Sequence, residues 1–517
     1  MSNGNSTAAA AKPAAKKSST PPAQIAEPTH VPALFRKIDW AAFLLTTLIV
    51  FAGYLWTLAP EMTLEDSGEL AVGSLYAGIP HPPGYPVWTI YTHLFQKLVP
   101  IGNIAYRVGM ASALAGALAS GLLALLVSRG SSMMIEGIEG LEKLERRTEN
   151  LICLVSGYTA GFLIGFNSYM WSQAVIVEVY PFGVLSLMGV LLCLLRWIYA
   201  PHQRRYLYGA LFLFGVCFTN HQSLLAAAMG IEIAIAVGQP KLGRDMFFGN
   251  AVIYIAYNLM VATGHVVFQN LQGGMMHHLF HAVGLGSIVG CIWLTIKTEK
   301  ILTEWKAVLI LGIAFLVGAS FYFYMPLAGM STPPMQWGYP RTVEGFIHAL
   351  TRGQYEQPHP TDIFADPFRV VMQLGILLGG VSDEFGWIFT ALALVPFLYF
   401  FKMQRRERAW LVGVFAIYLC LGPLLMILFN LSPDRSAISL TKVFFTASHV
   451  MISLLAGYGA TLVMASLSAN FPDFRSIGLI GGIAAVDFAV LTVIAAVQKL
   501  HCGTTSVEAD DTLIWGR

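Results

Sequence analysis

Long apolar runs separated by short polar segments dominate this 517-residue chain. A helix that crosses the roughly 30 Å hydrocarbon core of a membrane needs about 20 mostly apolar residues, and about thirteen runs approach that length. The pattern therefore predicts an all-α polytopic membrane protein. The runs lie near residues 40–58, 108–128, 151–166, 182–199, 206–219, 223–237, 246–262, 283–296, 307–326, 385–401, 409–428, 444–465 and 476–497.

The composition agrees with a membrane protein and sets the first residues apart. Hydrophobic residues make up 56% of the chain and charged residues 12%, against about 25% charged residues in soluble domains. Residues 1–35 are rich in Ala, Lys, Pro and Ser without apolar periodicity, which predicts a disordered tail. Because this tail lacks the apolar core of a secretory signal, we expect the run at 40–58 to remain as a membrane helix. We expect no nucleic-acid partner.

The lysines and arginines predict the orientation of the chain. With the N-terminus in the cytoplasm, most of the 31 lysines and arginines fall on the cytoplasmic side. This orientation gives a cytoplasmic tail, a transmembrane domain at 36–497 and a short extracytoplasmic tail at 498–517. The first and fifth outer loops, 60–107 and 327–384, are much longer than connections require, so we expect the function on the outer face.

Three carboxylates follow the first apolar run directly: Glu65, Asp66 and Glu69. In a helix, Glu65 and Glu69 would share a face and repel each other. One interpretation is a solvated helix start, with Asp66 as the N-cap and the acids facing the helix dipole. The other interpretation is a functional site, and the next segment favours it.

The segment at 79–86 contains four prolines and carries His81 and Tyr85. Proline fixes φ and lacks a backbone donor, so this segment cannot form a regular helix or a central strand. We expect a rigid loop that brings an imidazole and a phenol close to the preceding acids at the membrane surface.

Two further polar clusters lie between apolar runs. Glu178 stands among valines just before Tyr180, where a lone carboxylate usually faces a cavity or a partner, with an interfacial anchor as the alternative. Asn220 and His221 interrupt the apolar sequence between two predicted helices. For His221 taken alone, a tight polar turn is the favoured interpretation.

The second long outer loop combines aromatic and basic residues, namely Trp337, Arg341, Arg352 and Tyr355. Aromatic rings stack on sugars, and guanidinium groups pair with phosphate. The same residues also suit an aromatic belt at a membrane interface.

In their order and spacing, these motifs resemble the protein O-mannosyltransferase-like family, a bacterial family related to the eukaryotic plexin-type O-mannosyltransferases. Each motif is weak alone, whereas the ordered set, spread over residues 40–459, is specific. The motifs are Asp66-Ser-Gly-Glu69, His81-Pro-Pro-Gly-Tyr-Pro86, Trp171-Ser-Gln173, Glu178-Val-Tyr180, Thr219-Asn-His221, Met325-Pro326, Trp337-Gly338 and Arg352-Gly-Gln-Tyr355.

The resemblance implies a GT-C glycosyltransferase: a helical membrane body whose first outer loop carries an acidic motif. It implies transfer of a hexose, mannose first, from a polyprenyl phosphate donor to an acceptor hydroxyl with inversion. The acceptor remains open among protein, lipid and polysaccharide. The bacterial character of the family implies the inner membrane as the location.

The resemblance also implies residue roles. Asp66 would be the general base, and Glu69, His81 and Glu178 would orient the base or the acceptor, or hold a divalent metal ion if one is used. The leaving phosphate would need cations, for which the outer face offers Arg341, Arg352, Arg435 and Lys442. No metal or cofactor is predicted with certainty.

The ordinary pKa values support Asp66 as the base. An aspartate with a pKa of about 3.9 is ionised at neutral pH, whereas a histidine near 6.5 is partly protonated. The residues alone do not decide between Asp66 and Glu65. The rival hypotheses are a transporter or flippase of lipid-linked sugars, for which Glu232 and Asp487 are the deep carboxylates, and a non-catalytic membrane scaffold.

Overall fold

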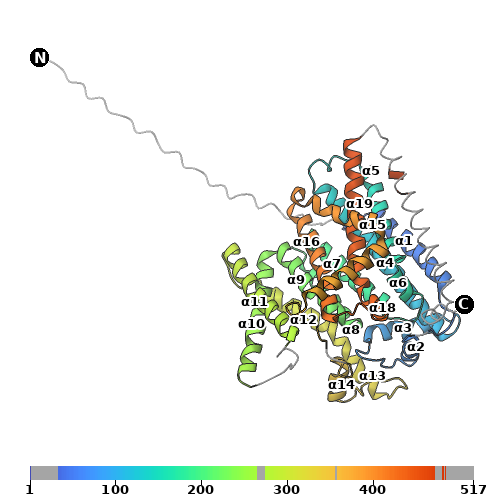
Figure 1. Cartoon of the computed structure of the whole chain (residues 1–517). Coiled ribbons are helices and arrows are strands. Elements are labelled where there is room, and N and C mark those ends of the chain that lie inside the picture. Colours follow the sequence, from blue (N-terminus) through green and yellow to red (C-terminus); the bar gives the residue numbers. More distant parts are fainter. Residues whose placement is uncertain are drawn as a thin grey trace. The chain divides into compact units, whose positions relative to one another are not determined.

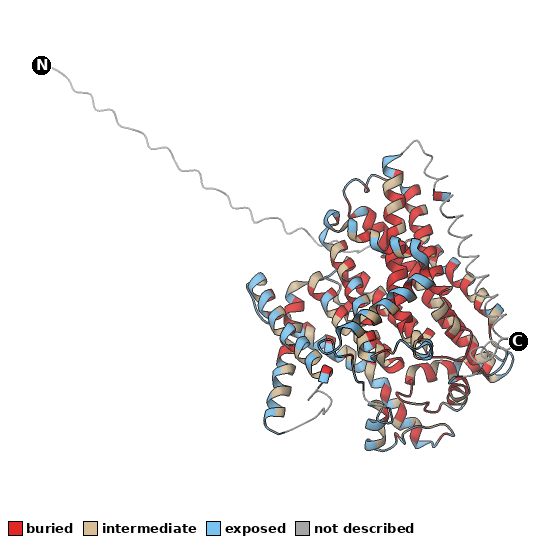
Figure 2. Cartoon of the chain, in the orientation of Figure 1, coloured by how far each residue is buried: buried red, intermediate tan, exposed pale blue. Residues whose placement is uncertain are grey.

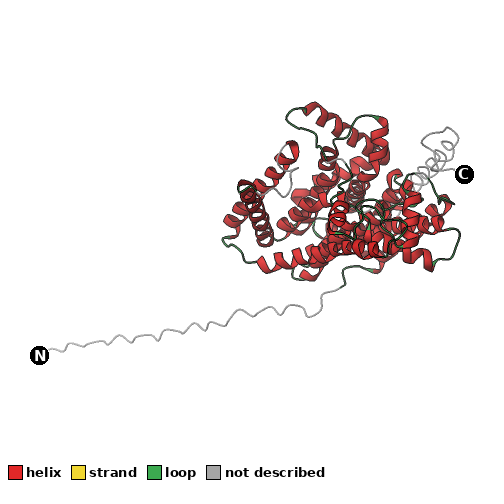
Figure 3. Cartoon of the chain, turned by 90° about the horizontal axis from the view of Figure 1, so that it is seen from below, coloured by secondary structure: helices red, strands yellow, loops and turns green. Residues whose placement is uncertain are grey.

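The computed structural model describes residues 33–471 except 64, 265–273 and 356–357, together with the single residues 1, 480, 481 and 484. In this part of the chain the secondary structure is helical, with two isolated β-bridges (Figure 3). Most of the predicted N-terminal tail, the predicted C-terminal tail and nearly all of the predicted span at 476–497 lie outside the described residues.

Nine described helical segments are long and apolar enough to cross a membrane (Figure 1). A tenth is α5 (Arg146–Gly165) with α6 (Ser168–Ala174), a pair bent by 65°. The all-α polytopic membrane protein is therefore confirmed, whereas the count of about thirteen spans stays a prediction. The nine are α1 (Lys37–Thr57), α4 (Ile104–Glu136), α7 (Tyr180–Tyr199), α10 (Pro240–Ala262), α11 (Gly274–Thr298), α12 to α13 (Trp305–Met330), α15 to η4 (Pro367–Lys402), α16 to α17 (Arg405–Phe429) and α18 to α19 (Arg435–Asn470).

Two predicted runs form shorter helices. α8 (Arg204–Asn220) has 17 residues. The run at 223–237 begins as a 3₁₀ turn, η1 (Gln222–Ala226), and continues as α9 (Ala227–Gly238).

α4 and α19 form the centre of the bundle (Figure 2). Their apolar windows are 78% and 83% buried, against 17% to 22% for α10, α11 and α12 to α13. Small residues let α4 approach its neighbours closely. At Gly121, a Cβ atom would collide with the Thr47 hydroxyl of α1.

The first of the two predicted outer loops contains two helices, α2 (Ser67–Tyr76) and α3 (Pro86–Leu98). The second is shorter than predicted. It ends at Asp366, because Pro367 occupies the first turn of α15 and the Asp366 carboxylate accepts a hydrogen bond from the Arg369 N–H at 3.0 Å. Within this loop, α14 (Val343–Leu350) is a further short helix.

The two predicted outer loops are joined by backbone hydrogen bonds. The Ile79 N–H donates to the Met335 carbonyl at 2.8 Å, and the Trp337 N–H donates to the Ile79 carbonyl at 3.1 Å. The Tyr324 hydroxyl donates to the Gly78 carbonyl at 3.2 Å. The proline-rich segment is therefore fixed against the second loop, which positions His81.

Candidate functional site

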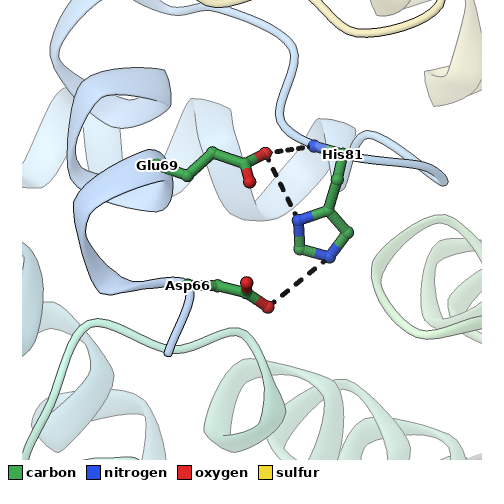
Figure 4. A group of neighbouring side chains, drawn as sticks. All are labelled: Asp66, Glu69 and His81. Carbon is green, nitrogen blue, oxygen red and sulfur yellow. Dashed lines mark hydrogen bonds and ion pairs between the residues drawn. The ribbon is translucent and has the colours of Figure 1, made fainter. Parts of the chain in front are cut away.

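The acidic motif lies at the start of α2. Asp66 occupies the N-cap position, as one interpretation expected, but its side chain makes no capping hydrogen bond. The hydroxyl of Ser67, the next residue, donates to the Val177 carbonyl at 3.4 Å. The Asp66 carboxylate points toward His81 instead and is 54% exposed, so a substrate can reach it (Figure 4).

His81 is held by groups on both sides of its ring (Figure 4). One Glu69 oxygen accepts from the His81 backbone N–H at 2.5 Å and lies 3.3 Å from ring Nδ1. Ring Nε2 lies 2.8 Å from the Tyr85 hydroxyl and 3.8 Å from Asp66 Oδ2. Nδ1 therefore faces Glu69, and Nε2 faces both Tyr85 and Asp66.

The environment of Tyr85 keeps its hydroxyl protonated. Burial raises the pKa of Tyr85 well above its ordinary value, the Arg352 guanidinium opposes this, and the carboxylates of Glu178 and Asp66 add to it. A protonated phenol is a donor, in agreement with its hydrogen bond to His81.

The fold brings this loop close to α2. A Cβ atom at Gly73 would lie 2.8 Å from the Pro80 ring, so glycine lets α2 pack against the proline-rich segment. Gly84 has a φ of +85°, a conformation that glycine adopts without strain, just before α3.

Asp66, Glu69 and His81 could together hold a metal ion. One ligand atom from each residue lies within 4.8 Å of the others. Two carboxylates and an imidazole suit a divalent first-row cation, with water completing the coordination.

Glu178 lies close to the acidic motif. Its side chain is buried, and one carboxylate oxygen accepts from the Val179 N–H at 3.1 Å. Burial raises the pKa of Glu178 well above its ordinary value, and the carboxylates of Glu65 and Asp66 raise it further. Its backbone carbonyl accepts from the Trp88 indole N–H at 3.2 Å, which attaches α3 to this segment.

Tyr180 and His221 form an aromatic cluster with a residue that the sequence did not indicate, Phe444. The Tyr180 ring lies 5.1 Å from His221 and 5.7 Å from Phe444, and His221 stacks on Phe444 at 5.5 Å. Burial and the charge of Arg352 lower the pKa of His221 to about 3, so the ring is neutral at physiological pH.

Asn220, from the Thr219-Asn-His221 motif, is buried, and both its amide oxygen and its amide nitrogen make hydrogen bonds within the protein. It accepts from the Trp88 N–H at 3.1 Å and donates to the Ser186 hydroxyl at 3.2 Å. These bonds hold the first turn of α3.

The predicted cations separate into two groups. The charge of Lys442 acts on Glu65, and that of Arg352 acts on Tyr85 and His221.

The remaining predicted residues of the second loop and α18 make no described contact with the side chains of the acidic motif. The exposed Arg341 stacks over Tyr339 at 4.7 Å, and the exposed Arg435 begins α18, with no described contact to the acidic motif. Trp337 is 42% exposed, and its backbone N–H donates to the Ile79 carbonyl of the proline-rich segment. Tyr355 packs under Arg352 at 4.5 Å.

Glu65 differs from Asp66 in its surroundings. Its backbone is left-handed, with a φ of 62°. Desolvation and the Asp66 carboxylate raise the pKa of Glu65, and Lys442 and the Gln173 amide oppose this rise. Gln173 is buried and was part of a family motif without an assigned role. Its place in the Trp171-Ser-Gln173 motif was the sequence feature that could have indicated a role for Gln173.

Glu384 was also missed. Its carboxylate accepts from the Ser168 N–H at 2.7 Å and from the Ser168 hydroxyl. Glu384 follows Asp383 and two glycines, so nothing in the sequence distinguished it from a loop carboxylate.

Comparisons with known proteins bear on this segment. Residues 66–242 match the family model described as the Protein O-mannosyl-transferase TMEM260 N-terminal domain. The mouse Protein O-mannosyl-transferase TMEM260 is 25% identical over 420 residues, which cover 80% of this chain and 48% of that protein. The Dictyostelium discoideum protein of the same name is 33% identical over 76 residues, which cover 14% of this chain and 9% of that protein. The chain thus spans about half the length, or less, of these relatives.

Among solved structures, ArnT from Cupriavidus metallidurans bound to undecaprenyl phosphate aligns with a TM-score of 0.26 and 13% identity, over 84% of this chain and 80% of that chain. This score is too low to support an argument.

The family match begins at Asp66 and includes Glu69, His81, Tyr85 and Glu178. The predicted resemblance to the protein O-mannosyltransferase-like family is thereby confirmed, and residues 66–242 carry it.

Proposed function

We propose that this chain is an integral membrane glycosyltransferase of GT-C architecture. It moves a hexose, mannose first, from a polyprenyl phosphate donor to an acceptor hydroxyl on the extracytoplasmic side, with inversion. The observation that carries the proposal is the position of Asp66, an accessible carboxylate beside a fixed imidazole, at the start of a segment that matches an O-mannosyl-transferase domain.

The proposed step is a single displacement. The acceptor oxygen forms a bond to the anomeric carbon while the bond from that carbon to the phosphate oxygen breaks. Asp66 takes the acceptor proton, and the polyprenyl phosphate leaves with the bonding electron pair. Glu69, His81 and Tyr85 orient the acceptor and the base through their hydrogen bonds.

The electrostatics of the site suit an anionic leaving group. The charge of Lys442 acts on Glu65 and that of Arg352 acts on His221, and both cations would stabilise the phosphate. Burial raises the pKa of both Glu65 and Glu178. Asp66 is the proposed base because its carboxylate is exposed and faces His81.

Other parts of the proposal rest on the sequence. Trp337, Tyr180 and Tyr355 offer aromatic surface for the sugar, and Arg341 and Arg435 offer further outer cations. The acceptor class stays open among protein, lipid and polysaccharide. The proposed location is a bacterial inner membrane, with the N-terminus in the cytoplasm.

No specific observation favours the transporter or scaffold alternative. Of the two deep carboxylates, Glu232 accepts from the Asn250 amide at 2.8 and 3.0 Å, and Asp487 lies outside the described residues.

The test uses the full chain purified in lipid nanodiscs with a membrane acceptor fraction. Labelled mannose is offered on polyprenyl phosphate and, in parallel, on a sugar nucleotide. Transfer from the lipid donor alone, with opposite anomeric configuration in donor and product by NMR, supports the proposal. Transfer from the nucleotide, retention of configuration, or no transfer from any polyprenyl-linked hexose overturns it.

A further inference from the structure

Glu384 lies where two helical segments are interrupted. α5 and α6 are bent by 65° at the break between Gly165 and Ser168. α15 is broken at Gly386, whose φ of 63° and ψ of 165° are not helical. Both breaks belong to segments long and apolar enough to cross a membrane, where free backbone N–H groups are costly. Other groups of the protein must therefore satisfy the start of α6.

Side chains satisfy the first N–H groups of α6. One Glu384 carboxylate oxygen accepts from the Ser168 N–H at 2.7 Å, and the other accepts from the Ser168 hydroxyl. The Asn167 side chain accepts from the Tyr169 N–H at 3.1 Å. Because Glu384 comes from α15, its two hydrogen bonds attach the start of α6 to another helix.

His449 of α19 packs against the neighbours of both bonded residues. Its ring centroid lies 4.4 Å from that of Tyr169, which follows Ser168. It lies 5.2 Å from that of Phe385, which follows Glu384. His449 and Phe385 are buried. One side chain therefore fixes both segments, which restricts the orientation in which Ser168 and Glu384 meet.

The segment that begins with α6 is also attached to the end of α1. The Trp171 indole N–H donates to the Thr57 hydroxyl at 2.8 Å, and the Ala59 N–H donates to the Val175 carbonyl at 2.9 Å. Thr57 is the last residue of α1, and the chain from Ala59 leads into the acidic motif. The position of α6 therefore determines where this part of the chain leaves α1.

The same segment contacts the start of α2. The Ser67 hydroxyl donates to the Val177 carbonyl at 3.4 Å, and Ser67 directly follows Asp66 in the chain. The contacts of residues 168–177 therefore lie both before the acidic motif and within it. A displacement at the start of α6 would reach Asp66 through these contacts.

We infer that Glu384 is a positioning residue for the acidic motif and acts through its hydrogen bonds to Ser168. The inference rests on the proposed function, since Asp66 is the proposed base. This role does not require the charge of Glu384. A glutamine amide could accept from the Ser168 N–H and donate to the Ser168 hydroxyl, whereas an alanine side chain could do neither.

The experiment uses the full chain in lipid nanodiscs and compares Glu384→Ala with Glu384→Gln. Asp383→Ala is the matched control, because it removes the neighbouring, exposed carboxylate. Ser168→Ala, alone and combined with Glu384→Ala, isolates the contribution of the hydroxyl. Each variant is measured for melting temperature, for kcat and the donor KM in the transfer assay, and for hydrogen exchange of backbone amides by mass spectrometry.

Glu384→Ala should lower kcat about tenfold with little change in the donor KM, because it removes two hydrogen bonds to a carboxylate. Peptides that cover residues 66–76 and 168–177 should exchange faster, whereas the peptide that covers α14 should be unchanged. Glu384→Gln and Asp383→Ala should match the wild type in all three measurements. Ser168→Ala should lower kcat less than Glu384→Ala, and the double variant should lose no more than Glu384→Ala alone.

A loss in Glu384→Gln as large as in Glu384→Ala overturns the inference, because the charge is then what matters. Unchanged exchange at residues 66–76 in Glu384→Ala overturns it too. So does an equal loss in Glu384→Ala and Asp383→Ala. Faster exchange in all peptides of Glu384→Ala, α14 included, also overturns it, because Glu384 then only stabilises the fold.

The exchange measurement does not depend on transfer, so the two claims can fail separately. Transfer that needs Asp66 but is indifferent to Glu384 removes only this inference. The expected exchange pattern in a wild type that transfers no hexose removes only the proposed glycosyltransferase.

Discussion

One carboxylate oxygen of Glu69 contacts His81 twice, accepting from the backbone N–H at 2.5 Å and lying 3.3 Å from ring Nδ1. This double contact fixes both the proline-rich loop and the imidazole ring beside Asp66. We therefore expect Glu69 to act by positioning His81 and the loop, and not by contacting the substrate.

Glu69→Gln should lower transfer about 10- to 100-fold, because hydrogen bonds to charged groups contribute about 1.5–3 kcal/mol. Because the role is positioning, kcat should fall more than the KM for the donor changes. Glu61→Gln, which removes an exposed acid from the same loop, is the control. An equal loss in both variants would contradict a specific role for Glu69.

Tyr85→Phe should lower transfer about tenfold by removing the hydrogen bond of 2.8 Å to His81 Nε2. Because burial raises the pKa of Tyr85, its hydroxyl should stay protonated through the alkaline range, and the wild type should show no loss of activity from its ionisation. A rate profile of wild type and variant from pH 7 to pH 10 measures this. An alkaline limb that Tyr85→Phe abolishes would contradict it.

His221 should make the fold sensitive to acid. Its pKa falls from 6.5 to about 3 in the folded chain, so the unfolded chain binds a proton between these values and the folded chain does not. Stability is therefore lost as pH falls below 6.5, by about 1.4 kcal/mol per pH unit for this group. Thermal unfolding at pH 6.5 and pH 5 should show a smaller acid-induced decrease in His221→Phe than in the wild type. Equal decreases would show that His221 is protonated when folded.

Gly121→Leu should destabilise the bundle by about 1–3 kcal/mol or more, because its side chain would collide with Thr47 across the contact of α4 and α1. Gly312→Leu in α12 is the matched control, since a Cβ atom there has open space around it. Melting temperatures in the same detergent give the comparison. Equal melting temperatures would show that α1 and α4 are not tightly packed there.

The helices could be predicted from the sequence because span length and apolar content are local properties. The end of the second long loop could not be predicted in this way. The stretch at 367–384 contains glycines, Asp383 and Glu384, which favour a loop, yet it forms the first part of α15. Its helical structure depends on packing, in which buried Gln373 and Leu377 face the protein.

In the candidate site, too, some features follow from the local sequence and others depend on packing. Asp66, Glu69 and His81 could be predicted together because they are close in the sequence and His81 lies in a rigid proline-rich loop. The cations could not be ranked, because Lys442 and Arg341 look equivalent as outer basic residues. Only the folded chain shows that the charge of Lys442 acts on Glu65, whereas Arg341 lies over Tyr339.

The central claim is that Asp66 takes the acceptor proton. The most direct test compares Asp66→Asn with the adjacent Glu65→Gln in the transfer assay, at matched melting temperature and donor binding. The account predicts that Asp66→Asn loses transfer by at least about a hundredfold, as expected for removal of a general base, while Glu65→Gln stays within about tenfold of the wild type. Full transfer by Asp66→Asn, or a larger loss in Glu65→Gln, would contradict the account.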